Sequence, residues 1–394
     1  MSVLGIICEY NPFHAGHAAH IAESRAAVGA DSPVVCVMSG DFVQRGTPAV
    51  YNKHIRAKAA CAAGADLVLE LPLPWSIASA ERFARGGVDL LNSLGVVTHL
   101  CFGSECGELA PLTALALAAS QPEVLDEVKT AMESGMAFAP ARQMVLEKRL
   151  GKDCAELLEK PNNILGVEYL KAIFALDAEL TPVTSRRTGS MHDAQNGGER
   201  RCASEIRTML EAGEDASAFI PAEANAVFAG CEAVYTEHLE QAFMARLRAL
   251  SEADFKALPD AGDGLGSRLY KAVRTEGSVE ALLSAVKTKR YAMSRLRRML
   301  TAAVLGVTAE MQEQLPPYAR VLAANETGRK LLREMDGVSA VPLITKAASV
   351  KELDEQARRV FTLGADARDF YALGSRSAAG RRGGTDWKTN PAMI

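Results

Sequence analysis

The chain has 394 residues, of which 48% are hydrophobic and 23% charged, with a formal net charge of −4; these are the proportions of an ordinary globular protein with room for two domains. No apolar run reaches the ~18 residues of a membrane span, and Glu9 and Asn11 interrupt the first apolar run too early for a signal peptide, so we expect no membrane association and a cytoplasmic location. The eight cysteines are scattered, with only Cys101 and Cys106 close together, which argues against a zinc site and favours reduced structural thiols.

The first half of the sequence alternates short apolar runs with helical stretches. Runs rich in Val, Ile and Leu predict strands at 3–8, 34–38, 65–71 and 99–102, and helical spacing predicts helices at 17–28, 54–63 and 78–93. Unbroken apolar runs are typical of strands that helices cover on both faces, as in a parallel sheet. The order of the elements therefore predicts a Rossmann-like, doubly wound α/β domain.

The rest of the sequence is expected to be mostly helical. Residues 109–176 have helical spacing, and 181–185 predict a last strand. Beyond about residue 210, Ala, Leu, Glu and Arg dominate and strand-like runs nearly vanish. We therefore predict an α/β domain at 1–210 and a mostly helical domain at 211–394, with a frayed Gly- and Arg-rich tail at 380–394.

Three of the seven histidines stand close together in GIICEYNPFHAGHAAH, where the first predicted strand gives way to the first helix. The ligand crevice of an open α/β sheet lies at the carboxyl ends of its strands, and a helix that starts there directs its unpaired N–H groups and positive end at the ligand. His14 and His17 would add neutral or cationic donors for a polyphosphate, and Gly16 lets a ligand approach the backbone. We interpret His20 as a surface or packing residue, and no acidic or cysteine partner with ligand spacing supports a metal site.

HAGH resembles the HxGH signature of the nucleotidyltransferase superfamily, whose members transfer a nucleotidyl group and release pyrophosphate. The longer motifs GIICEYNPFHAGH, MSGDFVQRGTPAVYNKHIRAKAACAAGADLVLELP, CFGSE and PNNILGVEYLKAI are similar to those of the bacterial tRNA(Met) cytidine acetate ligase family. The likeness continues with KTKRYAMSRLRRML and PYARVLAANETGRKLL, so it covers most of the chain. It implies an enzyme that activates acetate with ATP as acetyl-adenylate and then acetylates N4 of the wobble cytidine of elongator tRNA(Met).

The resemblance also implies partners and site residues. ATP, with Mg²⁺ on its phosphates, would be the cosubstrate, tRNA and acetate would be the other partners, and we expect no obligate protein partner. His14 and His17 would be catalytic, and the segment implied to bind ATP comprises Ile7, Cys8, Glu9, Tyr10, Asn11, Pro12, Phe13, His14, Ala15, Gly16, His17, Ala18, Ala19 and His20. Further ATP contacts would come from Gly103, from one of Asn162 and Asn163, and from one of Arg186 and Arg187; the sequence leaves both choices open.

Three other residues are candidates for phosphate or substrate contacts. Arg45 follows the second strand in SGDFVQRGTPA, where a loop salt bridge is the alternative. Ser204 and Arg207 in CASEIR resemble the Ser/Thr-x-x-Arg motif that nucleotidyltransferases use on the β- and γ-phosphates, although Cys202 departs from the usual Ser. Ordinary helix-start sequence looks the same, because Ser is a good N-cap.

Two acidic residues come at the ends of predicted strands. Glu70 ends the third strand and Glu105 follows the fourth, both at the carboxyl edge of the predicted sheet. Either one could orient a histidine or the ribose, or could cap a helix, and the sequence leaves these alternatives open.

A basic segment is expected to face RNA. The stretch KTKRYAMSRLRR at 287–298 holds six basic residues and no acidic one. As a helix it would place Met293, Leu296 and Leu300 on one side and its basic residues on the other, which suits contact with a phosphate backbone; the alternative is a surface helix whose arginines pair with acids. Tyr291 either stacks on a base or packs internally. The residues expected to bind tRNA are Lys287, Lys289, Arg290, Arg295, Arg297 and Arg298.

Alternative functions can be weighed from the sequence. A small-molecule adenylyltransferase would share the HxGH crevice, but that function would not explain the helical half of the chain and its basic segment. A non-catalytic RNA-binding protein with a vestigial nucleotide site would not need His14, Gly16 and His17 intact. An aminoacyl-tRNA synthetase is disfavoured, because the sequence has no KMSKS-like lysine loop.

Overall fold

The computed structural model describes residues 1–394 except 188–191, 194–197, 200 and 263. At its centre is a sheet with parallel strands in the order β5-β2-β1-β6-β7. These strands are β1 (Leu4–Cys8), β2 (Val34–Ser39), β5 (Leu67–Leu71), β6 (His99–Ser104) and β7 (Thr181–Arg186). Each lies on a predicted strand, so the prediction of a doubly wound α/β fold is confirmed.

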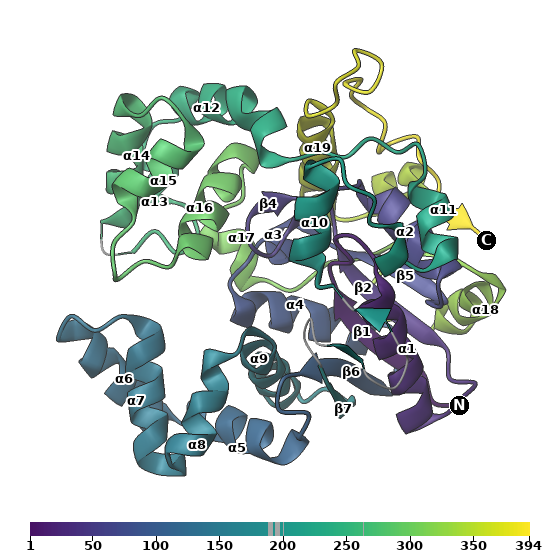
Figure 1. Cartoon of the computed structure of the whole chain (residues 1–394), viewed down its shortest axis with the longest axis horizontal. Coiled ribbons are helices and arrows are strands. Elements are labelled where there is room, and N and C mark those ends of the chain that lie inside the picture. Colours follow the sequence, from purple (N-terminus) through teal and green to yellow (C-terminus); the bar gives the residue numbers. More distant parts are fainter. Residues whose placement is uncertain (188–191, 194–197, 200, 263) are drawn as a thin grey trace.

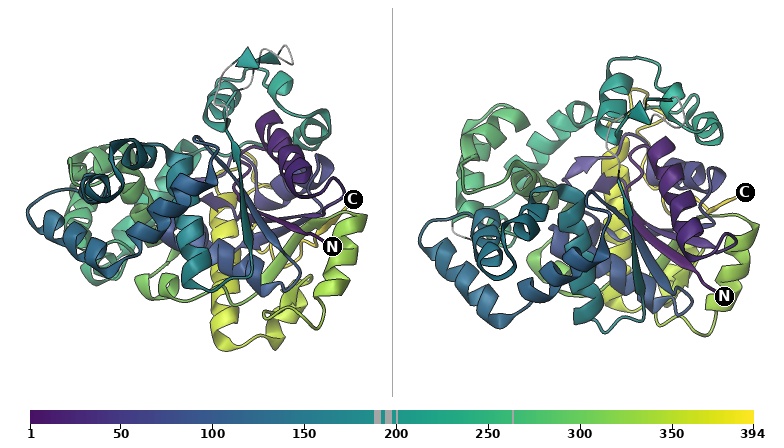
Figure 2. Two further views of the ribbon diagram at one scale, coloured as in Figure 1. Left: turned by 90° about the horizontal axis from the view of Figure 1, so that it is seen from below. Right: turned by 60° about the horizontal axis from the view of Figure 1, so that its bottom comes forward.

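Helices cover both faces of this sheet, which explains why its central strands β1 and β2 are almost entirely apolar. α1 (Ala15–Val28) and α2 (Lys53–Ala62) lie on one face, and α4 (Ala80–Ser93) and α9 (Pro161–Ala175) lie on the other (Figure 2). All six residues of β2 are buried. Separate hydrophobic cores fill the space beneath the two helical layers.

The strand order reverses next to β1. The chain pairs β2 with one side of β1, continues outward to β5, and then returns to pair β6 with the other side. In such sheets a ligand binds outside the carboxyl ends of the strands at this switch point. The turn between β1 and α1 and the residues that follow β6 and β7 therefore lie at one edge of the sheet, which is where the predicted site residues fall.

The second half of the chain returns to the sheet. β10 (Ala319–Ala324) pairs antiparallel with β5, and β11 (Leu343–Ile344) and β12 (Ala392–Met393) both pair with β10. The helical expectation for 211–394 overlooked these strands: β10 reads ARVLAA, whose alanines favour a helix, and pairing in the buried sheet overrides that preference. The boundary at residue 210 stays a prediction, and the sheet contains strands from both sides of it.

Two groups of helices extend from one side of the molecule (Figure 1). The first group is inserted between β6 and α9, and the second packs around a core that also includes Phe42, Leu73 and Ile77 from the segments that follow β2 and β5. The first group consists of α5 (Leu109–Ala119), α6 (Pro122–Glu133), α7 (Phe138–Leu150) and α8 (Lys152–Glu156). The second consists of α12 (Glu240–Ala249), α13 (Glu252–Lys256), α14 (Leu265–Thr275), α15 (Val279–Val286) and α16 (Met293–Leu305).

The remaining elements connect these parts. A short hairpin, β3 (Phe42–Val43) and β4 (Thr47–Pro48), follows β2, and α10 (Ala203–Glu211) and α11 (Ala222–Phe228) lie near α1 and α2 (Figure 1). The other helices are α3 (Leu73–Ser76), α17 (Ala309–Glu313), α18 (Glu326–Met335) and α19 (Glu355–Ala372). Short 3₁₀ segments are η1 (Leu157–Glu159), η2 (Ser217–Phe219), η3 (Thr236–Leu239) and η4 (Ala347–Glu352), and a two-stranded ribbon is formed by β8 (His192–Asp193) and β9 (Gly198–Glu199).

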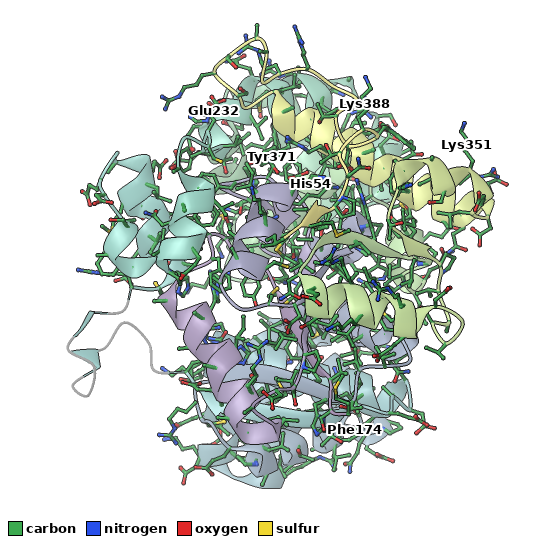
Figure 3. The ribbon with its side chains drawn as sticks, turned by 90° about the vertical axis from the view of Figure 1, so that its right-hand side faces the viewer. His54, Phe174, Glu232, Lys351, Tyr371 and Lys388 are labelled. Atoms are coloured by element: carbon green, nitrogen blue, oxygen red, sulfur yellow. The ribbon has the colours of Figure 1, made fainter. Side chains whose placement is uncertain are left out.

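The structure differs from the predicted frayed tail. Asp386 is buried, and its carboxylate accepts hydrogen bonds from Lys53 Nζ at 2.8 Å and from Arg320 Nη1 at 2.6 Å. His54 Nε2 lies 3.0 Å from the same carboxylate, where the C-terminal segment crosses α2 (Figure 3). The C-terminal segment is therefore fixed to the sheet by an ionic cluster that joins residues far apart in the sequence.

Candidate active site

The first turn of α1 is built around two imidazoles. His14 is the N-cap residue, and its Nδ1 accepts a hydrogen bond from the Gly16 N–H at 3.0 Å. His17 Nδ1 accepts from the His14 N–H at 3.3 Å, and the two rings lie 3.8 Å apart. A neutral imidazole whose Nδ1 accepts carries its proton on Nε2, so each ring presents an Nε2–H donor. His14 Nε2 is buried and has no hydrogen-bond partner in the described part of the chain.

These imidazoles are neutral at physiological pH. Burial lowers the pKa of His14 from 6.5 to about 4, and the charges of Arg187 and Arg207 act in the same direction. Burial, His14 and Arg187 hold the pKa of His17 well below 6.5, and burial and Arg187 lower the pKa of His20 to about 4. The sequence left open whether these histidines donate as neutral or as cationic imidazoles, and the lowered pKa values favour the neutral form.

The other side chains of the segment 7–20 largely face the protein. Tyr10 and Phe13 are buried in the core beneath α1, and Asn11 Oδ1 accepts a hydrogen bond from the Val50 N–H at 2.8 Å. The Glu9 carboxylate accepts from the Gln44 N–H at 2.8 Å. A ligand at this turn would therefore contact Tyr10, Asn11 and Phe13 through their main-chain atoms. That these three residues contact ATP stays a prediction.

A guanidinium group from the end of β7 approaches the imidazoles. The stem of Arg187 lies directly on Gly103, where a Cβ atom would come within 2.5 Å of Arg187 Cγ. Its backbone N–H donates to the Ser104 carbonyl at 2.7 Å, and its Nη1 donates to Asn162 Oδ1 at 2.8 Å. The absence of a side chain at Gly103 thus leaves room for Arg187, whose charge lowers the pKa of His14, His17 and His20.

The neighbours of Arg187 and Asn162 are engaged elsewhere. Arg186 Nη2 donates to the Cys106 carbonyl at 2.8 Å, away from the imidazoles. Asn163 is buried; its Oδ1 accepts from the backbone N–H groups of Glu105 and Cys106 at 2.9 and 3.1 Å, and its Nδ2 donates to the Leu157 carbonyl. The geometry therefore favours Asn162 and Arg187 over Asn163 and Arg186 as ligand contacts.

Glu105 holds the start of α9. Its Oε2 accepts from the Asn163 N–H at 2.8 Å, and its Oε1 accepts from the Asn162 N–H at 3.2 Å and from Asn162 Nδ2 at 2.7 Å. Of the alternatives left open for Glu105, the structure shows helix capping, with an additional bond to the side chain of Asn162.

A second guanidinium reaches the same turn from α10. Arg207 Nη1 donates to the Asn11 carbonyl at 2.7 Å. Ser204, one turn earlier, has its Oγ 3.0 Å from Cys202 Sγ. Arg45 is exposed at the tip of the β3–β4 hairpin, close enough for its charge to lower the pKa of Arg207 after the larger effect of burial. The described chain offers Arg45 no salt bridge, so the loop alternative finds no support there.

Arg56 is a buried residue that the sequence analysis did not single out. Its guanidinium donates to the Tyr51 and Ser39 carbonyls at 2.9 Å each, and also to the carbonyls of Glu9 and Gly40. It therefore ties the ends of β1 and β2 to α2. The signal available in the sequence was an arginine within the alanine-rich helix KHIRAKAACA, where a buried charge must find several acceptors.

Glu70 lies in the ionic cluster of the C-terminal segment. Its carboxylate accepts from Lys53 Nζ at 2.8 Å and from Arg320 Nη1 at 3.3 Å, and all three side chains are buried. These bonds commit Glu70 to a structural role, in place of the orientation of a ligand or histidine.

The basic segment at 287–298 is only partly helical. α15 ends at Val286 and α16 begins at Met293, so the predicted helix over residues 287–292 is wrong. Lys287 Nζ donates to the Thr288 and Tyr291 carbonyls at 2.8 and 2.7 Å, which closes a turn. Tyr291 is buried in the core of α12–α16, so the packing alternative holds for it.

Two of its arginines contact Asp260, Arg295 through the main-chain carbonyl and Arg298 through the carboxylate. Arg295 Nη2 donates to the Asp260 carbonyl at 2.7 Å, and Arg298 Nη2 lies 3.5 Å from Asp260 Oδ2. The alternative of a surface helix whose arginines pair with acids therefore describes Arg298, and Arg295 is engaged by a backbone carbonyl instead. The exposed basic residues of the segment are Lys287, Lys289, Arg290 and Arg297. Their role in binding tRNA stays a prediction.

The basic helix borders a groove that leads toward the hairpin. Arg297, Met293 and Thr301 of α16 line one side of a cavity of about 620 Å³, and Gly46 and Thr47 line another. Thr301 Oγ1 donates to the Gly46 carbonyl at 2.8 Å, which fixes the hairpin tip to α16. The exposed Arg45 precedes Gly46 in the chain and is thereby kept near α16.

The arrangement can bind an anion and stabilise negative charge, because helix N–H groups, two Nε2–H donors and two guanidinium groups converge on one turn. In the described residues no cluster of three His, Cys, Asp or Glu side chains could hold a metal ion. No described helix is long and apolar enough to cross a membrane.

Comparisons with known proteins agree with this geometry. Residues 1–386 match the family described as HIGH Nucleotidyl Transferase. The chain is 35% identical over 412 aligned residues to the tRNA(Met) cytidine acetate ligase of Acetivibrio thermocellus, covering 99% of both chains. It is 36% identical over 392 residues to the protein of that name from Thermoanaerobacter sp., covering 96% of this chain and 97% of the relative.

A solved structure is similar over the whole length. The crystal structure of Thermotoga maritima TmcAL bound with alpha-thio ATP superposes with a TM-score of 0.93 at 30% identity and covers 100% of this chain and 99% of that chain. Full-length identity above 30%, the matching fold and the HxGH turn at the switch point all agree. The chain belongs to the tRNA(Met) cytidine acetate ligase family of HIGH nucleotidyltransferases.

Proposed function

We propose that this protein activates acetate with ATP and transfers the acetyl group to N4 of the wobble cytidine of elongator tRNA(Met). In the first step a carboxylate oxygen of acetate attacks the α-phosphorus of ATP, the bond to the β-phosphate oxygen breaks, and pyrophosphate leaves. In the second step the cytidine N4 attacks the carbonyl carbon of acetyl-adenylate, loses a proton, and AMP leaves. The products are N4-acetylcytidine, AMP and pyrophosphate.

The site residues answer the main difficulty of the first step, which is electrostatic. Two anions must meet, and negative charge grows on the departing pyrophosphate. Donors fixed in place before the reaction stabilise such charge without the cost of reorganisation. His14 and His17 supply Nε2–H groups, and we assign them to oxygens of the polyphosphate. As neutral groups with low pKa values they act as hydrogen-bond donors rather than as general acids.

We assign the cationic contacts to Arg187 and Arg207. Arg187 reaches the imidazole turn across Gly103, and Arg207 reaches it from α10. Asn162, which bonds Arg187, is the member of its pair that we assign to the ATP site. We propose that Mg²⁺ enters bound to the phosphates of ATP, where it would neutralise charge, as is usual for nucleoside triphosphates.

We assign tRNA binding to the side of the molecule that carries α16. Lys289, Arg290 and Arg297 are exposed there, and Arg45 extends the basic surface toward the nucleotide turn. Contacts of this kind hold the phosphate backbone and place a nucleotide without reading its sequence. The net charge of −4 does not oppose this assignment, because a local basic surface acts within about one Debye length.

The observation that carries the proposal is the pair of neutral imidazoles whose Nδ1 atoms are committed to the helix start. Both Nε2–H groups are thereby available to a polyphosphate at the switch point of the sheet. The test is nucleoside analysis of tRNA after incubation with the protein, ATP and ¹⁴C-acetate. We expect label in N4-acetylcytidine, and formation of AMP and pyrophosphate that depends on acetate.

The same assay separates this function from its alternatives. A small-molecule adenylyltransferase would put no label into RNA, and a non-catalytic RNA-binding protein would form no AMP. Either result would overturn the proposal.

A further inference from the structure

A chain of hydrogen bonds leads from Glu105 to the guanidinium group of Arg187. Glu105 Oε1 accepts from Asn162 Nδ2 at 2.7 Å, and Asn162 Oδ1 accepts from Arg187 Nη1 at 2.8 Å. Glu105 is half-buried, whereas Arg187 is exposed and long. The bond to Asn162 is the side-chain hydrogen bond that anchors the Arg187 head group within the described part of the chain.

The carboxylate determines which way the Asn162 amide faces. A carboxylate only accepts hydrogen bonds and a guanidinium only donates them. Asn162 must therefore turn its NH₂ group toward Glu105 and its oxygen toward Arg187. If the amide were reversed, an oxygen would face the carboxylate and two donors would face each other at Arg187, which costs free energy at both ends.

Glu105 is itself held rigidly. It also accepts the first free N–H groups of α9, from Asn162 and Asn163, and its own N–H donates to Asn163 Oδ1 at 2.9 Å. The N-cap residue of this helix, Lys160, provides no side-chain cap, so Glu105 supplies the cap from another element. Its negative charge also lies at the positive end of α9, which that charge stabilises.

We propose that Glu105 is a positioning residue for the adenylation step, one that fixes the Asn162 amide so that Arg187 is held over the imidazole turn. This inference rests on the proposed function of Arg187 as an ATP contact. Glu105 touches no substrate, and its effect passes through Asn162. Loss of a charge-assisted bond in such a chain is expected to lower kcat/KM for ATP by about 10-fold.

The first test uses acetate-dependent ATP–pyrophosphate exchange, which requires no tRNA. Glu105→Gln should lower kcat/KM for ATP by about 10-fold, because a glutamine no longer dictates the orientation of the Asn162 amide. Glu108→Gln is the matched control: Glu108 is an exposed acid three positions on, 3.8 Å from Arg186, and outside the chain of bonds. In an Arg187→Ala background, Glu105→Gln should change the rate less than about 2-fold, because the group it positions is gone.

The second test restores the bonds with exchanged groups. Asn162→Asp alone places two carboxylates together and should impair exchange by about 10-fold or more. When Asn162→Asp is combined with Glu105→Gln, the new carboxylate again has a donor on one side and Arg187 on the other. The glutamine NH₂, in the place of Oε1, can donate to that carboxylate, and the glutamine oxygen, in the place of Oε2, accepts the Asn163 N–H, while the Asn162 N–H loses its acceptor. We expect the double variant to recover to within about 3-fold of the unmodified protein.

The outcomes separate this inference from the proposed function. The melting temperature of each variant is measured as well. A variant with a normal melting temperature and a reduced rate of ATP–pyrophosphate exchange supports the positioning role of Glu105. The inference would be overturned if Glu105→Gln and Arg187→Ala lowered kcat/KM for ATP by factors that multiply in the double variant. It would also be overturned if the folded variant that combines Asn162→Asp with Glu105→Gln stayed inactive. Absence of exchange in the unmodified protein would instead reject the proposed function, and binding of ATP to the same variants would then test the positioning of Arg187 independently.

Discussion

Each imidazole in the first turn of α1 has one nitrogen committed to the helix and one left for a ligand. His14 Nδ1 takes the Gly16 N–H and His17 Nδ1 takes the His14 N–H, which together form a reciprocal cap. A cap of this kind is normally made by Ser, Thr or Asp, whose side chains leave no second donor aimed outward. Histidine serves both as cap and as donor, which is a physical reason for the HxGH spacing.

Removing one of these donors should slow adenylation while leaving the fold intact. His17→Ala is expected to reduce acetate-dependent pyrophosphate exchange roughly 10²–10³-fold, since one preorganised donor contributes about 2.7–4 kcal/mol to the barrier. His17→Gln, which keeps an N–H donor, should retain more activity. His238→Ala, in η3 away from the turn, serves as the control. Near-normal exchange by His17→Ala at saturating ATP would remove His17 from the site.

The low pKa values of the histidines also predict how stability varies with pH. Burial and Arg187 lower the pKa of His20 from 6.5 to about 4, so between these values the unfolded chain takes up a proton that the folded chain does not. Stability is therefore complete above about pH 6.5 and falls as the pH decreases toward 4, by about 1.4 kcal/mol per pH unit for each such histidine.

The measurement is urea denaturation at intervals from pH 6.5 to 4.5. His20→Asn should reduce the slope of unfolding free energy against pH by about one proton. A variant whose slope equals that of the unmodified protein would show that His20 titrates normally in the folded state.

At the scale of elements, the β3–β4 hairpin joins the nucleotide turn to α16. In the turn of the hairpin, the Gln44 N–H donates to the Glu9 carboxylate and the Gly46 carbonyl accepts from Thr301. Gly46 has a φ of +73°, and a Cβ atom there would lie 2.6 Å from the backbone nitrogen of Arg298. The hairpin can approach α16 this closely only with glycine at that position.

Gly46→Ala should therefore lower the free energy of unfolding by more than the cost of placing alanine in a left-handed backbone conformation. The left-handed conformation costs about 1–2 kcal/mol for a residue with a side chain, and the contact with α16 adds about 1–3 kcal/mol. Gly384→Ala isolates the first effect, because Gly384 has a φ of +71° and nothing within 4 Å of its Cβ position. Equal losses in the two variants, measured by urea denaturation, would contradict the close contact.

The exposed face of α16 and the loop before it should contribute to RNA affinity. Arg290→Glu combined with Arg297→Glu is expected to weaken tRNA binding and to reduce the magnitude of the slope of log K against log salt by about 0.7–0.9 for each phosphate that the protein no longer neutralises. Binding of ATP should be unchanged. Lys351→Glu, at an exposed lysine of η4 (Figure 3), gives a charge reversal elsewhere on the surface for comparison. An unchanged salt slope would exclude this segment from the interface.

At the scale of the whole molecule, the C-terminal segment closes the structure over the sheet. The Asp386 carboxylate bonds Lys53 of α2 and Arg320 of β10, and Glu70 of β5 completes the cluster. Burial alone would raise the pKa of Asp386, but Lys53, His54 and Arg320 together lower it, so the carboxylate stays charged. Tyr371 of α19 adds a bond to the Ala49 carbonyl at 2.7 Å (Figure 3).

Neutralising Asp386 should be strongly destabilising. Asp386→Asn leaves the buried cations with Glu70 as their remaining acidic partner, and breaking a buried ionic cluster on one side typically costs about 3–5 kcal/mol. Asp366→Asn, at an exposed aspartate of α19, is the control and should have little effect. Thermal and urea unfolding of the full chain provide the measurement. A loss below about 1 kcal/mol would show that the C-terminal segment does not stabilise the sheet.

The sequence by itself determined the first four parallel strands and the histidine turn, because unbroken apolar runs and the HxGH spacing are local patterns that can be recognised without knowing the tertiary contacts. Only the tertiary structure favours Arg187 over Arg186 as a ligand contact, because the Arg186 guanidinium bonds the Cys106 carbonyl whereas the stem of Arg187 lies on Gly103. The same holds for Glu70 and Asp386, whose ionic bonds join segments more than three hundred residues apart through Lys53. Local sequence carries backbone preference, but charge pairing and strand register depend on which distant segments the core brings together.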